Sequence, residues 1–355
     1  MRILSATEAI SPAFSRTKLV LFTPYRIGRT WKLATTAYLS MASTVFLPWP
    51  FIYLLFIPFV HQMPGVNSSA VVIILAVVLT LTLIWIVIFY LISRLRFAYF
   101  DVVLNHGQFI APAWRKYGNQ SRKWTLFKLL LGTFCMAAVA LPVVHIAREL
   151  FKTFSSLPMQ PGQPPSPEFF HAIITMYAAF FGFYILFGLF LWLSSILSDF
   201  IVPSLALEDT TLSEAFRRLG QLIRNEPAQF AAYAFLKPVF AFAGMMAAGL
   251  AFYIGLLIVA IAALLVAGII GLLLHLLHVP TAVLIALGIV FGVIVYITTF
   301  VYGMFLANGI VMTFLESYLL YFLGGRYPML GDLLDRSTPP PSLIPSPSSY
   351  SAPSP

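Results

Sequence analysis

The sequence predicts an all-α fold: a polytopic membrane helix bundle of about six transmembrane helices, arranged as three repeated units of an amphipathic helix plus a helical hairpin. Three observations lead to this prediction. The 355 residues are 60% hydrophobic and only 9% charged, whereas globular proteins carry about 25% charged residues. Several apolar stretches reach the roughly 20 residues that a helix needs to cross the hydrocarbon layer of a membrane. A short motif also recurs three times along the chain.

The recurring motif combines an alanine, an aromatic ring and basic side chains. Its copies cover residues 10–16 (ISPAFSR), 110–116 (IAPAWRK) and 212–218 (LSEAFRR), at offsets of 100 and 102 residues. Two long apolar stretches follow each copy, and repetition at such a period indicates repeated structural units. We therefore expect one membrane domain over residues 1–336, with pseudo-repeats at about 8–100, 101–205 and 206–325, and a disordered Pro/Ser-rich tail over residues 337–355.

Charge-poor stretches give six candidate crossings. They cover residues 33–60, 70–93, 125–147, 170–198, 229–260 and 281–315. The apolar stretch over residues 228–278 is longer than one crossing requires. Either its end, residues 271–278, lies along the outer surface, or a seventh crossing is hidden within it.

The distribution of basic residues predicts the orientation. With six crossings, all of the 21 Lys and Arg residues except Arg148 and Lys152 fall on one side of the membrane. Because cytoplasmic loops are enriched in Lys and Arg, we expect a multi-pass protein of the cell inner (cytoplasmic) membrane with both termini in the cytoplasm. The net charge of +9 fits an anionic inner leaflet, so membrane lipids are the expected partner. Nucleic acid is not expected, because the cations are scattered around apolar spans.

Eight residues of the three motif copies are candidates for contact with lipid headgroups: Phe14, Arg16, Trp114, Arg115, Lys116, Phe216, Arg217 and Arg218. In each copy the aromatic ring follows an alanine and precedes the cations by one or two positions. A helix there could set the ring into the headgroup boundary and direct its charges to lipid phosphates. The alternative is that the three rings staple each short helix onto the membrane bundle.

Three acidic residues follow the even-numbered spans: Asp101, Asp199 and Glu316. Ionisable groups at such positions are expensive and therefore informative. They are possible gate acids, lining a cation or proton path at the cytoplasmic mouth of the repeats. The alternative is local pairing with Arg94, Arg96 or Arg217, or hydrogen bonds from the amides of a helix N-terminus.

The sequence shows no set of residues that makes a recognisable active site. It has no HExxH pair, GxSxG elbow, phosphate loop or GxGxxG turn. His275 and His278 share a helical spacing, but no nearby residue completes a metal site. The single cysteine, Cys135, gives neither a disulfide framework nor a cysteine metal cluster. We therefore expect no enzyme, no catalytic residues, no metal and no cofactor.

Short aromatic and basic segments carry a family resemblance. They cover residues 13–18 (AFSRTK), 96–101 (RFAYFD) leading to 112–117 (PAWRKY), and 199–203 (DFIVP) leading to 215–218 (AFRR). In these segments the chain resembles an uncharacterised prokaryotic integral membrane family, similar in layout to the multi-span domain fused to some glycerophosphodiester phosphodiesterases. The resemblance covers roughly residues 8–325. It implies a six-helix inner-membrane protein and brings no catalytic residues.

Taken together, these features predict a non-enzymatic membrane scaffold or lipid-associated accessory protein. The recurring residues lie at the ends of the apolar spans, and the spans themselves are almost free of polar groups. The alternative function is a transporter or channel for a hydrophobic or lipid-like solute, since many transporters are built from internal repeats.

Overall fold

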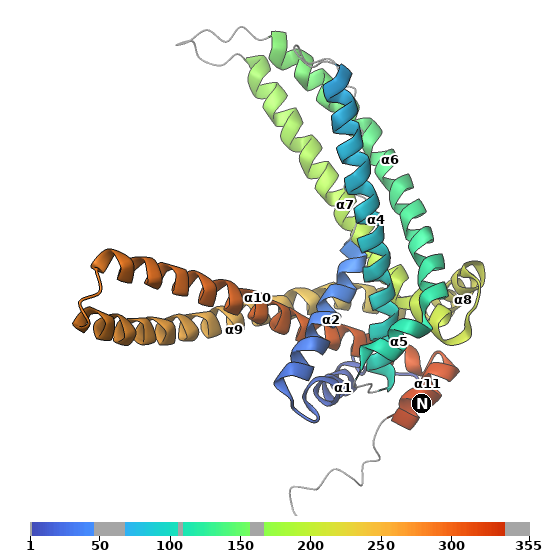
Figure 1. Cartoon of the computed structure of the whole chain (residues 1–355). Coiled ribbons are helices and arrows are strands. Elements are labelled where there is room, and N and C mark those ends of the chain that lie inside the picture. Colours follow the sequence, from blue (N-terminus) through green and yellow to red (C-terminus); the bar gives the residue numbers. More distant parts are fainter. Residues whose placement is uncertain (1, 46–67, 106–108, 157–166, 338–355) are drawn as a thin grey trace, which may run out of the picture. The chain divides into compact units, whose positions relative to one another are not determined.

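The computed structural model describes residues 2–45, 68–105, 109–156 and 167–337, and over these residues the protein is helical and contains no strand. The helices are α1 (Ile10–Phe22), α2 (Ile27–Val45), α4 (Ser68–Asn105), α5 (Ile110–Lys116), α6 (Gly118–Ser156), α7 (Pro167–Glu208), α8 (Leu212–Asn225), α9 (Pro227–Leu276), α10 (Thr281–Gly324) and α11 (Pro328–Ser337). Figure 1 shows them coloured along the chain. The tail predicted over residues 337–355 lies, after Ser337, outside the described residues.

A helix begins at the first residue of every motif copy, at Ile10 in α1, at Ile110 in α5 and at Leu212 in α8. Within the described residues, each of these short helices is followed by two longer ones, namely α2 and α4, α6 and α7, and α9 and α10. Each motif copy therefore coincides with the start of a helix. A structural repeat of three units with amphipathic helices stays a prediction.

Four helices are long and apolar enough to cross a membrane, judged over the described residues: α4, α7, α9 and α10. They contain the predicted crossings at residues 70–93, 170–198, 229–260 and 281–315. The predicted crossing at residues 125–147 is helical as part of α6, but α6 is not one of the four. Of the crossing predicted at residues 33–60, α2 covers the first part and the remainder lies outside the described residues. Six crossings are therefore not shown.

The long apolar stretch over residues 228–278 forms one helix. α9 continues without a break for 50 residues, which corresponds to about 75 Å at 1.5 Å per residue. The chain turns only after Leu276, with His278 in the left-handed region at a φ of 63°. Residues 271–276 therefore continue the same helix, and α9 contains no turn at which a second crossing could begin.

The chain forms two compact units, each of which combines segments that are separated in the sequence. Unit 1 consists of Met1–Leu39, Ala98–Ala113 and Arg217–Pro355, and unit 2 of Ser40–Phe97 and Trp114–Phe216. In unit 1, α9 and α10 lie side by side as an antiparallel hairpin, and α1 and α11 pack against α10 (Figure 1). In unit 2, α6 packs against α7.

The core of unit 1 surrounds the C-terminal half of α10. Tyr318 and Phe322 of α10 are buried and stack on Tyr233 of α9, with ring centroids 5.2 and 4.6 Å away. On the other side, α2 approaches so closely that a Cβ atom on Gly309 would overlap the backbone of Ala34. These contacts make the base of the hairpin a packed core.

The core of unit 2 contains charged groups. Arg96 and Asp199 are buried and form an ion pair between α4 and α7. The buried Lys128 of α6 lies with its Nζ 5.6 Å from the ring centre of Phe89 and 5.8 Å from that of Trp124. Such cation–π contacts partly replace the water that a buried ammonium group loses.

Candidate functional site

The outer part of the α9–α10 hairpin is apolar on all sides. Residues 254–274 of α9 and 282–295 of α10 include no polar side chain. In each helix, none of the most apolar 18-residue stretch is buried inside the protein. Large side chains such as Leu264 and Ile289 are 73% and 61% exposed. A surface of this size and composition is stable next to lipid, whereas in water it would drive association.

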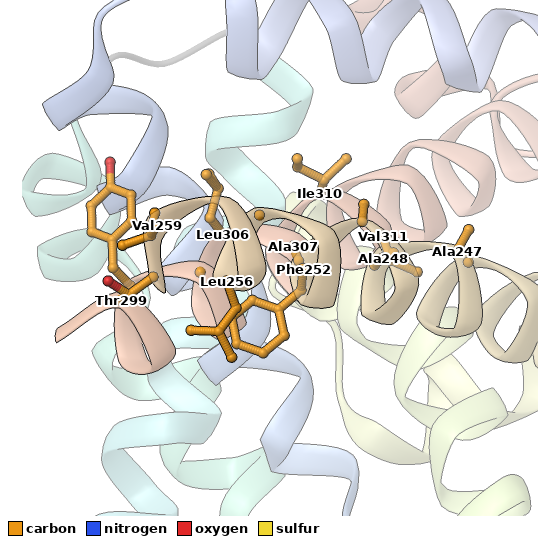
Figure 2. Close-up of a pocket in the computed structure, with 15 residues that line it drawn as sticks. Ala247, Ala248, Phe252, Leu256, Val259, Thr299, Leu306, Ala307, Ile310 and Val311 are labelled. Carbon is orange, nitrogen blue, oxygen red and sulfur yellow. The ribbon is translucent and has the colours of Figure 1, made fainter. Parts of the chain in front are cut away.

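A groove of about 530 Å³ runs between α9 and α10, between the packed base of the hairpin and its apolar outer part. Ala247, Ala248 and Phe252 of α9 line one side of the groove, and Leu306 and Ile310 of α10 line the other (Figure 2). The polar side chains that line the groove are those of Thr299 and Tyr302, and no charged residue lines it. The volume falls within the range of ligand pockets, about 300–1,000 Å³.

Glycines explain both the close approach of the two helices and the space left between them. A Cβ atom on Gly244 would lie 2.7 Å from Val311, and one on Gly303 would lie 2.7 Å from Phe252. With any larger residue at Gly244 or Gly303, the Val311 or Phe252 side chain would have to move. At Gly255, which also lines the groove, a Cβ atom would have no neighbour within 4 Å, so the groove is open there.

The aromatic rings of the three motif copies contact longer helices. Phe14 lies 4.8 Å from Phe314 of α10, and Phe216 lies 5.1 Å from Phe127 of α6, both measured between ring centroids. The guanidinium of Arg94 lies 4.9 Å above the ring of Trp114, and its Nε donates a hydrogen bond to the carbonyl of Trp114 at 2.9 Å. Through these contacts the rings attach the short helices to longer ones, which is the alternative to insertion among lipid headgroups. Phe14 nevertheless stays 65% exposed.

The alanine in each motif copy lies at a buried position of its helix. Ala13, Ala113 and Ala215 occupy the same place in the three copies and are 0%, 4% and 1% exposed. Each lies on the face of its short helix that packs inward. A larger side chain there would push the helix away from its neighbours.

Arg16 differs from the placement expected for a headgroup contact. It is 1% exposed, and its guanidinium donates hydrogen bonds to the carbonyls of Val103 and Leu104 and to Oγ of Ser337. Burial lowers the pKa of this guanidinium, but arginine stays protonated at neutral pH. A cation is favourable at a helix C-terminus, and Arg16 therefore caps the end of α4. Arg16 lies on the same face of α1 as the buried residues Ala13 and Val20, and this position directs its side chain inward.

The other cations of the motif lie near the surface. Arg115, Lys116 and Arg217 are exposed and Arg218 is half-buried. Lys116 places its Nζ 4.8 Å from the ring centre of Tyr117. These side chains are accessible to a ligand, and contact with lipid headgroups stays a prediction for them.

The three acidic residues fall into different units. Asp199 belongs to unit 2 and forms the local pair with Arg96, at 3.2 Å, which was the alternative to a gate role. Asp101, which is half-buried, and Glu316, which is fully buried, belong to unit 1. A gate role stays a prediction for Asp101 and Glu316. Within the described residues, no three His, Cys, Asp or Glu side chains come together as a metal-binding group.

Sequence reasoning missed a polar connection at the base of the hairpin. Arg326 donates from Nε and Nη2 to Oε2 of Glu226, at 3.1 and 2.6 Å, and from Nη1 to the carbonyl of Leu4 at 2.8 Å. It thereby ties the N-terminal segment and the start of α9 to the end of α10. The groove was also missed, since it depends on the separation of two helices. Its only sequence signal is the row of Gly and Ala residues in α9.

The long exposed apolar helices fit the class of α-helical membrane proteins. The chain belongs to a family of unknown function (DUF7544), whose model matches residues 4–333. No curated protein and no solved structure matches it. The family match provides no link to the phosphodiesterase fusions, so that likeness stays a prediction.

Proposed function

We propose that this protein is a non-enzymatic, lipid-associated accessory protein of the cytoplasmic membrane, with several crossings and both termini in the cytoplasm. The observation that carries the proposal is the length of exposed apolar helix. Exposed large side chains extend over residues 72–91 of α4 and 283–301 of α10, which correspond to about 30 and 29 Å. The hydrocarbon layer of a bilayer is about 30 Å thick.

The helices become buried where the exposed part ends. Ser93 and Arg96 of α4, and Val311 and Leu315 of α10, are buried in the protein. A helix that is largely exposed over the thickness of a bilayer and packed beyond it is what a membrane anchor joined to a compact base requires. The absence of an enzymatic role is proposed from the sequence, in which the HExxH, GxSxG, phosphate-loop and GxGxxG motifs do not occur.

The expected lipid partners are anionic, because exposed cations accompany two of the short helices. Arg115, Lys116 and Arg217 are exposed, and each cation close to an anionic surface contributes about 1 kcal/mol to the attraction. A reconstitution experiment tests this role. Spin-labelled phosphatidylglycerol and phosphatidylcholine are compared for their relative association with the protein in vesicles.

We expect wild-type protein to prefer phosphatidylglycerol, and replacement of Arg115, Lys116, Arg217 and Arg218 by Gln to remove most of this preference. Lys152→Gln is the control, because Lys152 is exposed, pairs with Glu149 at 2.8 Å and is predicted on the opposite face. An unchanged preference in the fourfold variant would remove the anionic-lipid role and leave the membrane anchor.

A second candidate function is the carriage of a hydrophobic or lipid-like solute. The groove between α9 and α10 favours it, because a concave apolar surface is the usual form of a binding site for such a molecule. Transport between two vesicle populations, measured with a fluorescent lipid, separates the two functions. An accessory protein leaves the exchange rate at the protein-free value, whereas a carrier raises it.

A further inference from the structure

We propose that the groove between α9 and α10 binds one hydrocarbon chain of a membrane lipid. This inference rests on the proposed function, because the membrane supplies the lipid. It goes further in assigning a defined site in the hairpin to one lipid chain.

The register of the hairpin sets the depth of each groove residue. The ring centroids of Phe252 in α9 and Phe300 in α10 are 5.6 Å apart. A Cβ atom built on Gly303 would lie 2.7 Å from the Phe252 ring, and one built on Gly244 would lie 2.7 Å from Val311, so these residues face each other across the hairpin. Moving one residue toward the tip in α9 therefore corresponds to moving one residue toward the tip in α10. By this register, Tyr253 is level with Tyr302.

Aromatic residues gather within about 9 Å of this level along the helix axis. Tyr253 is 66% exposed and Tyr296, nearer the tip, is 55% exposed. Tyr302 stacks on Trp31 of α2 with a centroid distance of 5.5 Å. Tyr and Trp are enriched at the membrane–water interface. From there to the tip, residues 254–276 of α9 span about 35 Å, close to the hydrocarbon thickness of about 30 Å.

The groove crosses this level. Its lining extends from Val259 and Thr299 on the tip side to Gly244 and Val311 on the base side, which is about 22 Å along α9. One end therefore opens into the hydrocarbon layer, and the other reaches toward the packed base. A chain can enter from the bilayer without passing through water.

The lining selects hydrocarbon over water. Apart from the hydroxyl-bearing side chains of Thr299 and Tyr302, the groove offers no polar side chain, and a bound water needs 2–4 polar partners. Lipid is the solvent around an exposed hairpin, so a lipid chain has the highest local concentration of any occupant. A flexible chain can also follow a groove that is lined in part by small residues, such as Ala247 and Ala248 in Figure 2.

A glycine inside the groove and one outside it give a matched test. Gly255 lines the groove and Gly249 does not, and a Cβ atom on either has no neighbour within 4 Å. Both glycines lie within α9, so the replacement by Leu has the same effect on helix propensity in each. Gly255→Leu fills the groove and Gly249→Leu leaves it open.

The full chain is reconstituted into vesicles of phosphatidylcholine and phosphatidylglycerol, extracted in mild detergent and analysed by native mass spectrometry. We expect one tightly retained lipid on wild-type protein and on Gly249→Leu, and about tenfold lower occupancy on Gly255→Leu. Circular dichroism confirms folding. If Gly255→Leu does not fold, Ala251→Leu, at another lining position, takes its place.

Equal lipid retention by Gly255→Leu and wild type overturns the proposal. So does a wild-type dimer that Gly255→Leu dissociates in light scattering, because the groove is then an interface between two copies. Wild-type protein that floats with vesicles but retains no lipid overturns the groove assignment alone. Failure to float with vesicles overturns the proposed membrane function as well.

Discussion

Arg96 and Asp199 lie 103 residues apart in the sequence and form an ion pair, with Nη2 3.2 Å from Oδ1. Their side chains are 0% and 1% exposed. Arg96 also donates a hydrogen bond from Nη1 to Sδ of Met41 at 3.4 Å. Charges removed from water in this way stabilise a fold only while both partners are present. The pair therefore makes the packing of α4 against α7 sensitive to either residue.

The first prediction concerns this pair. Asp199→Ala leaves the Arg96 guanidinium buried without its carboxylate, and we expect a loss of about 3–5 kcal/mol in the free energy of unfolding. Reversible unfolding in mixed micelles measures it. Glu149→Ala is the control, because Glu149 is 56% exposed and 2.8 Å from Lys152, and exposed pairs contribute about 1 kcal/mol or less. Equal losses in both variants would contradict the structural role.

A second prediction concerns the contact between α2 and α10. A Cβ atom on Gly309 would overlap the backbone carbonyl of Ala34, so Gly309→Ala must push the two helices apart. We expect a destabilisation of about 1–3 kcal/mol, as in overpacked cores. Gly292→Ala has open space around it and should be neutral or stabilising by up to about 1 kcal/mol. Thermal unfolding of both variants provides the comparison, and a stabilised Gly309→Ala would refute the close packing.

The third prediction concerns Arg326. Two of its nitrogens share one carboxylate oxygen of Glu226, and a third holds the carbonyl of Leu4. Lys retains the charge but cannot bind both partners with a fork of N–H groups. Arg326→Lys should therefore accelerate hydrogen–deuterium exchange in the N-terminal segment around Leu4. Arg336→Lys, which removes a guanidinium from the end of α11, should leave that exchange unchanged.

A fourth prediction concerns pH. Hydrogen bonds from the backbone and side chain of Ser5 lower the pKa of Glu8 below 4.5, with a smaller contribution from Arg2. Because the folded-state pKa is depressed, the stabilisation is present above the unfolded pKa and is lost as pH falls through the lower folded value. A ¹³C titration of the Glu8 carboxyl should give a midpoint below 4.5, and Ser5→Pro, which removes the backbone donor, should raise it. An unshifted midpoint in wild type contradicts this hydrogen bond.

The sequence predicts the local features of this fold well. The motif predicts where α1, α5 and α8 begin, because its residues recur with fixed spacing and each copy leads into an apolar stretch. Four of the six predicted crossings coincide with long apolar helices, since uniform hydrophobicity over 20 residues is a strong signal. The pair of Asp199 with Arg96 was one of three partners that proximity to the spans suggested.

Features that depend on packing between distant segments could not be predicted. Arg16 is surrounded in the sequence by Phe, Ser and Lys residues typical of a surface helix, yet it binds carbonyls 87 and 88 residues away. The groove exists because Gly244 and Gly303 let two helices approach while Gly255 faces open space. The positions of glycines along one helix do not reveal which of them will face a side chain of the partner helix and which will face open space.

The depth of the hairpin in a bilayer tests the central claim most directly. Single cysteines introduced along α9 in a Cys135→Ala background carry nitroxide labels, and electron paramagnetic resonance compares their collision rates with oxygen and with a water-soluble nickel chelate. The account predicts that labels at Leu257, Leu264 and Leu272 collide with oxygen and are shielded from nickel, with the reversal near Tyr253. Nickel accessibility at Leu264 equal to that of a label at the exposed Lys18 would contradict it.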